Sequence, residues 1–145
     1  MNKSGHVLNA VLLSVGLAIV LGSGTGIPLL VVELLIPIVL GALFPDIDTV
    51  IGSHRKTLHN LPVLALFISF PIIFGNLQYV WVGVASHYML DLLCGRRGLA
   101  LFYPLPKEYS MSVGLPQSGR LSGLTATLIS IGQILLAAGF VALLG

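Results

Sequence analysis

The residues of this chain that could carry chemistry gather in one short stretch, residues 43–59. Two carboxylates and two imidazoles fall within 14 residues of a chain that is only 8% charged: Asp46, Asp48, His54 and His59. The stretch directly follows a long apolar run. Ionisable side chains are costly to desolvate at a membrane boundary, so a cluster of them there indicates a functional site. Mixed carboxylate oxygen and imidazole nitrogen donors suit zinc, manganese or iron better than calcium, which takes oxygen ligands.

The spacing of Asp46 and Asp48 constrains the backbone between them. Two residues apart on a regular helix, their side chains would point about 200° away from each other. They can therefore converge on one ion only where the backbone is not helical. Pro45 favours such a break, because it biases Phe44 towards extended geometry and ends or kinks a preceding helix.

A second pair of candidate ligands, His87 and Asp91, closes a later apolar run. Four residues apart, they share one face of a helix and lie one turn from each other. The spacing leaves three arrangements open: both residues bind one ion, they bind two adjacent ions, or Asp91 orients His87 from behind.

The composition places these residues in a membrane protein. The chain has 145 residues, 56% of them hydrophobic, and a mean hydropathy of +1.02. Such values lie outside the soluble range. We expect a single domain over residues 1–145. The formal charge of +2 is too small to indicate a nucleic-acid partner, and the lone Cys94, which we expect to be inert packing, excludes an intrachain disulfide.

Five apolar segments predict an all-α integral membrane protein, a bundle of about five transmembrane helices. The segments are residues 7–22, 27–44, 61–74, 77–93 and 121–144. The first resembles the apolar part of a signal peptide, but no clear Ala-x-Ala cleavage site follows, so we expect it to be retained.

The distribution of basic residues predicts the orientation of the bundle. Every Lys and Arg lies in residues 1–6, 45–60 or 95–120, and the opposite turns at 23–26 and 75–76 carry none. By the positive-inside rule the basic side is the cytoplasm, which puts the N-terminus inside and the C-terminus outside.

This topology brings all the histidines and aspartates to one membrane boundary. Taken singly, His6 could be a solvated terminal residue, Asp48 could cap a turn, and His87 and Asp91 could form a structural hydrogen bond. Their joint placement favours a metal site at the cytoplasmic helix ends, with seven candidate ligands: His6, Asp46, Asp48, His54, His59, His87 and Asp91.

The motifs also carry a family resemblance. The order is His6, Pro45-Asp46-Ile47-Asp48, His54-Arg55 with His59, Ser86-His87 with Leu90-Asp91, then Gly95 and Leu101-Phe102-Tyr103-Pro104. It resembles the YdjM-like family of predicted membrane-bound metal-dependent hydrolases over roughly residues 5–105. The resemblance implies an all-helical membrane hydrolase with a metal site at these positions. The His-x-x-x-Asp spacing is also distantly similar to a ligand pair of zinc-dependent phospholipase C enzymes. Lys56, Leu58 and Cys94 depart from the family pattern.

The number of ligands indicates more than one ion. Seven exceed the three or four that one catalytic zinc needs, so we expect two or more divalent ions, zinc or manganese, that activate water and stabilise charge on the substrate. Asp48 is the candidate bridging ligand and a catalytic residue, and Asp91 or Asp46 could instead act as general base.

Four basic residues surround the same face: Arg55, Lys56, Arg96 and Arg97. They could clamp a substrate phosphate, with Arg55 closest to the chemistry, or they could serve only topology and attraction to lipid headgroups.

The sequence therefore predicts a hydrolase that cleaves a phosphoester of a lipid or lipid-linked substrate in the cytoplasmic leaflet. The alternative is an ion or metal transporter, or a metal-binding membrane protein without activity. Transport sites usually lie near the bilayer midplane, whereas these ligands gather at one face. Haem is disfavoured by the crowd of carboxylates. The sequence leaves the substrate and the oligomeric state open.

Three further residues have predicted roles in the bilayer. Glu33 lies 13 residues before Asp46, about 20 Å along a straight helix. We expect it to be protonated or hydrogen-bonded to another span, with Gln133 as a possible partner. Tyr79 and Trp81, next to the outer turn, are predicted interface anchors.

Overall fold

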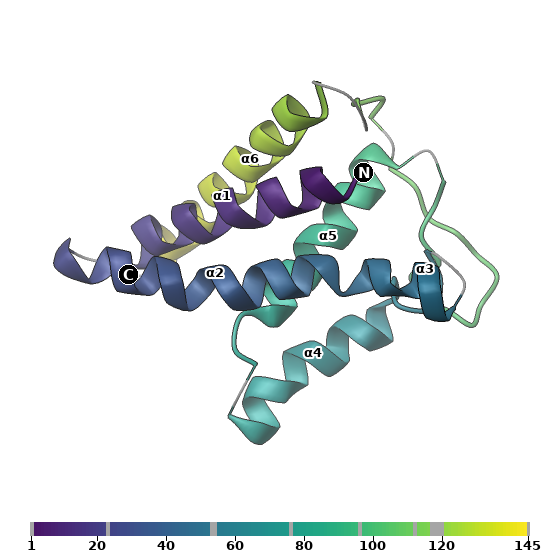
Figure 1. The fold of residues 1–145 in the computed structure, drawn as a ribbon, viewed down its shortest axis with the longest axis horizontal. Coiled ribbons are helices and arrows are strands. Elements are labelled where there is room, and N and C mark those ends of the chain that lie inside the picture. Colours follow the sequence, from purple (N-terminus) through teal and green to yellow (C-terminus); the bar gives the residue numbers. More distant parts are fainter. Residues whose placement is uncertain are drawn as a thin grey trace.

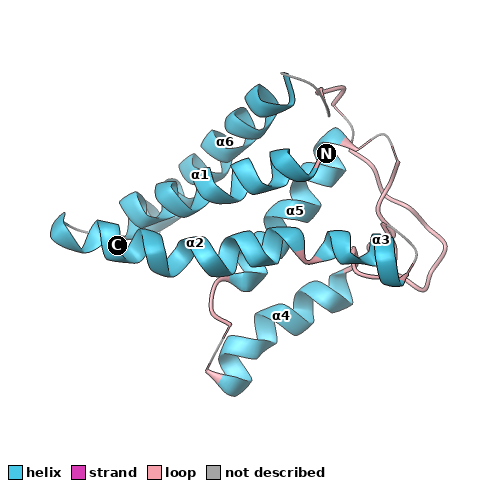
Figure 2. Ribbon diagram, viewed as in Figure 1, coloured by secondary structure: helices cyan, strands magenta, loops and turns pink. Residues whose placement is uncertain are grey.

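The computed structural model describes residues 2–22, 24–52, 55–75, 77–95, 97–111, 113–116 and 121–144. Within these residues the fold is all-α (Figure 2). The helices are α1 (Lys3–Leu21), α2 (Ile27–Leu43), α3 (Asp48–Ile51), α4 (Leu61–Phe74), α5 (Val80–Cys94) and α6 (Leu121–Leu144), with 3₁₀ turns at Gly24–Gly26 and Pro45–Ile47.

Three of the five predicted spans have the length that a bilayer requires. These are Lys3–Leu21, Gly24–Val50 and Leu121–Leu144. The other two are apolar but shorter, with 14 residues in α4 and 15 in α5. At 1.5 Å per residue they measure about 21–23 Å, less than the roughly 30 Å of a hydrocarbon core. The structure therefore supports three full spans and a pair of short apolar helices.

Close packing of α2 on α5 depends on two glycines. A Cβ atom at Gly41 would collide with the carbonyl oxygen of Val80, and one at Gly83 would collide with that of Ile38. Small residues let membrane helices approach at backbone distance. The contact continues towards the C-terminal end of α2, where buried Ala42 follows Gly41.

Figure 1 shows how the helix ends are arranged. The N-terminal ends of α1, α4 and α6 and the C-terminal ends of α2 and α5 lie towards one end of the molecule, with α4 and α6 on opposite sides. We call this end the loop end, because residues 44–60 and 95–120 connect the helices there. An antiparallel bridge between Leu99 and Tyr109 ties the longer connection to itself. Among the described candidate ligands, His6 lies near the start of α1, Asp46, Asp48 and His59 lie in the 44–60 connection, and His87 lies at the middle of α5 with Asp91 one turn further on.

Asparagine side chains begin two of these helices. Asn2 accepts a hydrogen bond from the Gly5 amide at the start of α1, and Asn60 accepts one from the Val63 amide at the start of α4. Such caps satisfy amides that have no partner inside the helix. Each cap fixes the backbone next to one candidate ligand. Asn2 lies four residues before His6, and Asn60 directly follows His59.

Candidate metal centre

His87 is held in one tautomer by the backbone of α2. Its Nδ1 lies 2.6 Å from the carbonyl oxygen of Ala42. A carbonyl can only accept a hydrogen bond, so Nδ1 carries the proton and Nε2 keeps its lone pair. The glycine contacts between α2 and α5 make this approach possible. His87 is fully buried, and its Nε2 faces the other candidate ligands.

His59 is oriented in the same way, but by a carboxylate. Its Nδ1 donates to Asp48 Oδ2 at 2.8 Å, and the same oxygen accepts the backbone N–H of Arg55 at 3.1 Å. His59 and Asp48 are both fully buried. In the neutral ring this pairing leaves Nε2 of His59 without a proton.

The Nε2 nitrogens of the two rings face each other. His59 Nε2 and His87 Nε2 lie 3.0 Å apart, and two lone pairs at that distance repel unless a cation or a proton lies between them. Zinc–nitrogen bonds are about 2.0–2.1 Å long, so both nitrogens can reach one ion. Asp46 Oδ1 lies 3.8 Å from His87 Nε2, which adds an oxygen donor. The residues present fit a divalent metal.

Asp91 connects this pair to His6. Its Oδ2 lies 3.8 Å from both His59 Nε2 and His87 Nε2, and its Oδ1 lies 3.4 Å from His6 Nε2. The His6 ring stacks on His87 with centroids 3.8 Å apart. His6 is buried, and among the described residues neither of its ring nitrogens has a hydrogen-bond partner. Buried polar atoms are rarely left unpaired, so this imidazole is a candidate metal ligand.

Two groups of residues could therefore hold metal ions. One consists of His6, His87 and Asp91, and the other of Asp46, His59 and His87. Because Nδ1 of His87 is bonded to Ala42, both groups depend on its Nε2. A neutral imidazole nitrogen has one lone pair, so His87 serves as ligand in one group at a time.

The structure separates the two adjacent carboxylates. The predicted end of the preceding helix at Pro45 is confirmed, because α2 ends at Leu43. The non-helical backbone expected between Asp46 and Asp48 is wrong, because Pro45 begins a 3₁₀ turn that leads into α3. Asp46 lies towards His87, whereas Asp48 bonds Nδ1 of His59, the nitrogen on the far side of the ring from Nε2. Neither group of candidate ligands contains Asp48, so its predicted bridging role gains no support. His54 lies outside the described residues.

The predicted phosphate clamp is largely occupied by other contacts. The Nη2 atom of Arg55 lies 3.4 Å from Asp91 Oδ2, and its Nη1 atom donates to the carbonyl oxygen of Arg97 at 2.7 Å. Lys56 pairs with Glu108 at 3.1 Å. Arg97 is exposed, and Arg96 lies outside the described residues. Arg55 thus restrains a candidate ligand, and its role towards substrate stays a prediction.

Sequence reasoning missed the polar contacts that support the centre. The Tyr88 hydroxyl donates to the carbonyl oxygen of Leu58 and lies 3.2 Å from the carbonyl oxygen of Asn60. These contacts anchor the backbone on both sides of His59 to α5. The signal was present, because Tyr88 directly follows His87, but an aromatic residue in a span normally indicates apolar packing.

A buried network lies one turn of α1 beyond His6. Asn9 donates to Ser130 and to Gln133, each at 2.8 Å, and Ser86 donates to Asn9. The network joins α1, α5 and α6. It also corrects the proposed partner of Glu33: Gln133 bonds these residues, while Glu33 is exposed on α2.

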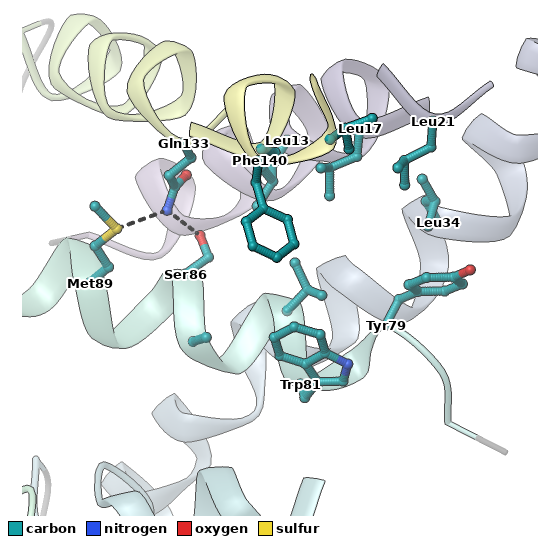
Figure 3. Close-up of a pocket in the computed structure, with 14 residues that line it drawn as sticks. Leu13, Leu17, Leu21, Leu34, Tyr79, Trp81, Ser86, Met89, Gln133 and Phe140 are labelled. Carbon is teal, nitrogen blue, oxygen red and sulfur yellow. Dashed lines mark hydrogen bonds between the residues drawn. The ribbon is translucent and has the colours of Figure 1, made fainter. Parts of the chain in front are cut away.

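An apolar cavity of about 520 Å³ begins at this network (Figure 3). Gln133 donates to Ser86 and Met89 at its polar end, and Phe140 and Trp81 lie further along it. A second apolar cavity of about 340 Å³ shares Ala85 and Met89 with the first and extends to Leu92 and Leu93. Apolar hollows thus accompany α5 over most of its length.

Comparison with known families identifies the architecture. The model of the YdjM inner membrane protein family matches residues 1–144. The chain belongs to this family. Searches among curated proteins and among solved structures give no match. Membership extends the resemblance from the motif region to the whole chain, and together with the three long apolar helices it makes the protein an inner membrane protein.

Proposed function

We propose that the protein is a membrane-embedded, metal-dependent hydrolase that cleaves a phosphoester of a lipid or lipid-linked substrate. The observation that carries the proposal is the pair of imidazole Nε2 nitrogens of His59 and His87, 3.0 Å apart. Each ring is fixed through its other nitrogen, and carboxylates lie beside both. Family membership is consistent with such a centre.

The ligand assignment follows the contacts. His59, His87 and Asp46 would hold one ion, zinc or manganese by donor type. Asp91 has one oxygen towards this pair and the other towards His6, which suits a carboxylate that bridges to a second ion at His6. This arrangement moves the bridging role from Asp48 to Asp91. When bound, the metal would activate water and stabilise negative charge on the phosphoryl oxygens.

Other groups act on the ligands, and one ligand, Asp46, has a second role towards protons. Asp48 and the Ala42 carbonyl keep the Nε2 atoms of His59 and His87 available. Arg55 restrains Asp91. Asp46 is the best-placed proton acceptor, because its side chain is 13% exposed while those of His87 and Asp91 are 0% and 3% exposed. A general base must reach the proton that it removes.

The lipid nature of the substrate is supported by the surroundings of the centre. The cavities along α5 have apolar walls, which suit hydrocarbon chains. The loop end carries the basic residues, so it would face the anionic lipids of the cytoplasmic leaflet. A phosphoester at headgroup depth would then lie level with the ligands.

The test combines metal analysis with a hydrolysis panel. Protein purified in detergent and loaded with zinc or manganese is offered phospholipids and lipid phosphates in mixed micelles, together with short-chain soluble analogues. We expect hydrolysis of a lipid phosphoester that chelators abolish, with slower turnover of the analogue. Asp46→Asn should lower kcat at least 100-fold, since general base catalysis contributes about 10²–10⁴-fold. Glu33→Gln, which neutralises an exposed carboxylate away from the centre, is the matched control.

Two results would contradict the proposal. Equal rates on lipid and soluble analogue would exclude a lipid-specific site. A metal-loaded protein that hydrolyses no lipid ester would favour the transporter or the metal-binding protein without activity.

A further inference from the structure

Asp46 is the most exposed of the candidate ligands that the structure describes. A cavity of about 220 Å³ lies against it, lined by Lys3, Leu43, Asp46, Ile47, Thr49 and Val50. The side chains of His6, His59, His87 and Asp91 are at most 3% exposed, against 13% for Asp46. We call this hollow the Asp46 pocket.

Lys3 supplies the basic group in the lining of the Asp46 pocket. It lies in the first turn of α1, three residues before His6, so that the two residues share a helix face. Lys3 is exposed and forms no ion pair among the described residues, in contrast to Arg55 and Lys56, which bind Asp91 and Glu108. Its ammonium group is therefore available to an anion that enters beside Asp46.

The rim of the same pocket is apolar. Ile47 and Val50 are 45% and 84% exposed at the end of the long apolar segment Gly24–Val50. An ammonium group beside exposed aliphatic side chains is the pattern expected at headgroup depth, where charge faces phosphate and aliphatic groups face the acyl region. A soluble anion would use the Lys3 charge but would gain nothing from Ile47 and Val50.

From these observations we propose that the Asp46 pocket binds the phosphate of a lipid headgroup and that Lys3 is its contact residue. The inference rests on the proposed function, because it assigns the entrance through which the phosphoester reaches the centre. It adds a residue that determines substrate binding and that is distinct from the arginines of the loop end.

The test measures lipid binding directly, so that it does not depend on turnover. Detergent-purified protein is titrated with dioleoyl phosphatidic acid, dioleoyl phosphatidylcholine or inorganic phosphate, and bound molecules are counted by native mass spectrometry. We expect phosphatidic acid to bind most tightly. Lys3→Gln should weaken its binding about fivefold, the equivalent of about 1 kcal/mol for one basic residue near an anionic surface. Lys3→Arg should retain the affinity.

Two further variants separate the pocket from general surface charge. Lys107→Gln removes a lysine of the 95–120 connection and should leave phosphatidic acid binding unchanged. Thr49→Trp keeps the charge of Lys3 but fills the cavity, and should weaken binding as much as Lys3→Gln. Equal binding in wild type and Lys3→Gln, or undiminished binding in Thr49→Trp, would overturn the inference. Inorganic phosphate binding as tight as phosphatidic acid would overturn the lipid assignment.

The outcomes also distinguish this inference from the proposed function. If a hydrolysed lipid is found, Lys3→Gln should raise KM with kcat nearly unchanged, because the contact is made before the chemical step. Lipid hydrolysis that is indifferent to Lys3 would leave the function standing and remove the pocket assignment. If binding depends on Lys3 but the metal-loaded protein hydrolyses no lipid, the pocket assignment stands and the proposed function is removed.

Discussion

At the scale of single residues, the centre divides into groups that face the ion and groups that hold them. His87 is common to both candidate metal groups, whereas Asp48 lies behind His59 on its protonated nitrogen. A carboxylate in that position fixes the tautomer and raises the basicity of the imidazole without touching the metal. The two residues should therefore respond differently to substitution.

We expect His87→Ala to abolish most metal binding, because it removes the nitrogen that both groups share. Asp48→Asn should retain binding but weaken the affinity about 10- to 100-fold, the usual effect of losing a carboxylate behind a ligating histidine. Metal content after dialysis against graded chelator measures both. Equal losses in the two variants would mean that Asp48 is itself a ligand, and unchanged affinity in both would exclude the site.

Sequence spacing predicted part of this geometry. The interval between His87 and Asp91 is a property of one helix, and the structure places both residues in one group of candidate ligands. The roles of Asp46 and Asp48 could not be derived in the same way, because they depend on the direction in which the chain leaves Pro45. The same holds for Arg55, whose guanidinium meets Asp91 across 36 residues of sequence only after folding.

At the scale of elements, the centre depends on how closely α2 approaches α5. The hydrogen bond from His87 to the Ala42 carbonyl requires backbone contact between the two helices, and Gly41 and Gly83 provide it. The pattern of charge and hydropathy along the sequence does not show which helices come into such contact. The glycines are recognisable as small residues in spans, but their partners become known only from the packing.

We expect Gly83→Val to separate α2 from α5 and to cost about 1–3 kcal/mol, the usual penalty for overpacking a close contact. The altered approach should also lower metal affinity, because Nδ1 of His87 loses its fixed acceptor. Gly139→Val is the matched control, since a Cβ there meets no atom within 4 Å. Thermal unfolding in detergent and metal titration follow the two effects. Similar behaviour of both variants would contradict the packing argument.

At the scale of the whole molecule, the sequence predicted the membrane class and the all-α fold, because hydropathy is a local quantity. It overstated the uniformity of the spans. Apolar runs of 14 to 17 residues suggest membrane spans in the sequence. The helices α4 and α5 are nevertheless too short to cross a bilayer unless the bilayer thins locally. His59 directly precedes the capped start of α4 and His87 lies at the middle of α5, and the two residues meet where these short helices pack together.

The orientation of the molecule is the last prediction, and it does not depend on how deeply α4 and α5 enter the bilayer. Whether this pair crosses completely or turns within the membrane, the chain enters it at residue 60 and leaves it at residue 95 at the same end of the molecule (Figure 1). With α1 and α2 crossing once each and α6 crossing last, the basic connections share one side, which the positive-inside rule assigns to the cytoplasm. Reporter fusions after Ser110 should therefore be active on the cytoplasmic side, and fusions after Gly145 on the outer side. If both fusions report the same side, α6 does not span the membrane in the predicted sense, and the placement of the centre at the cytoplasmic leaflet has to be abandoned.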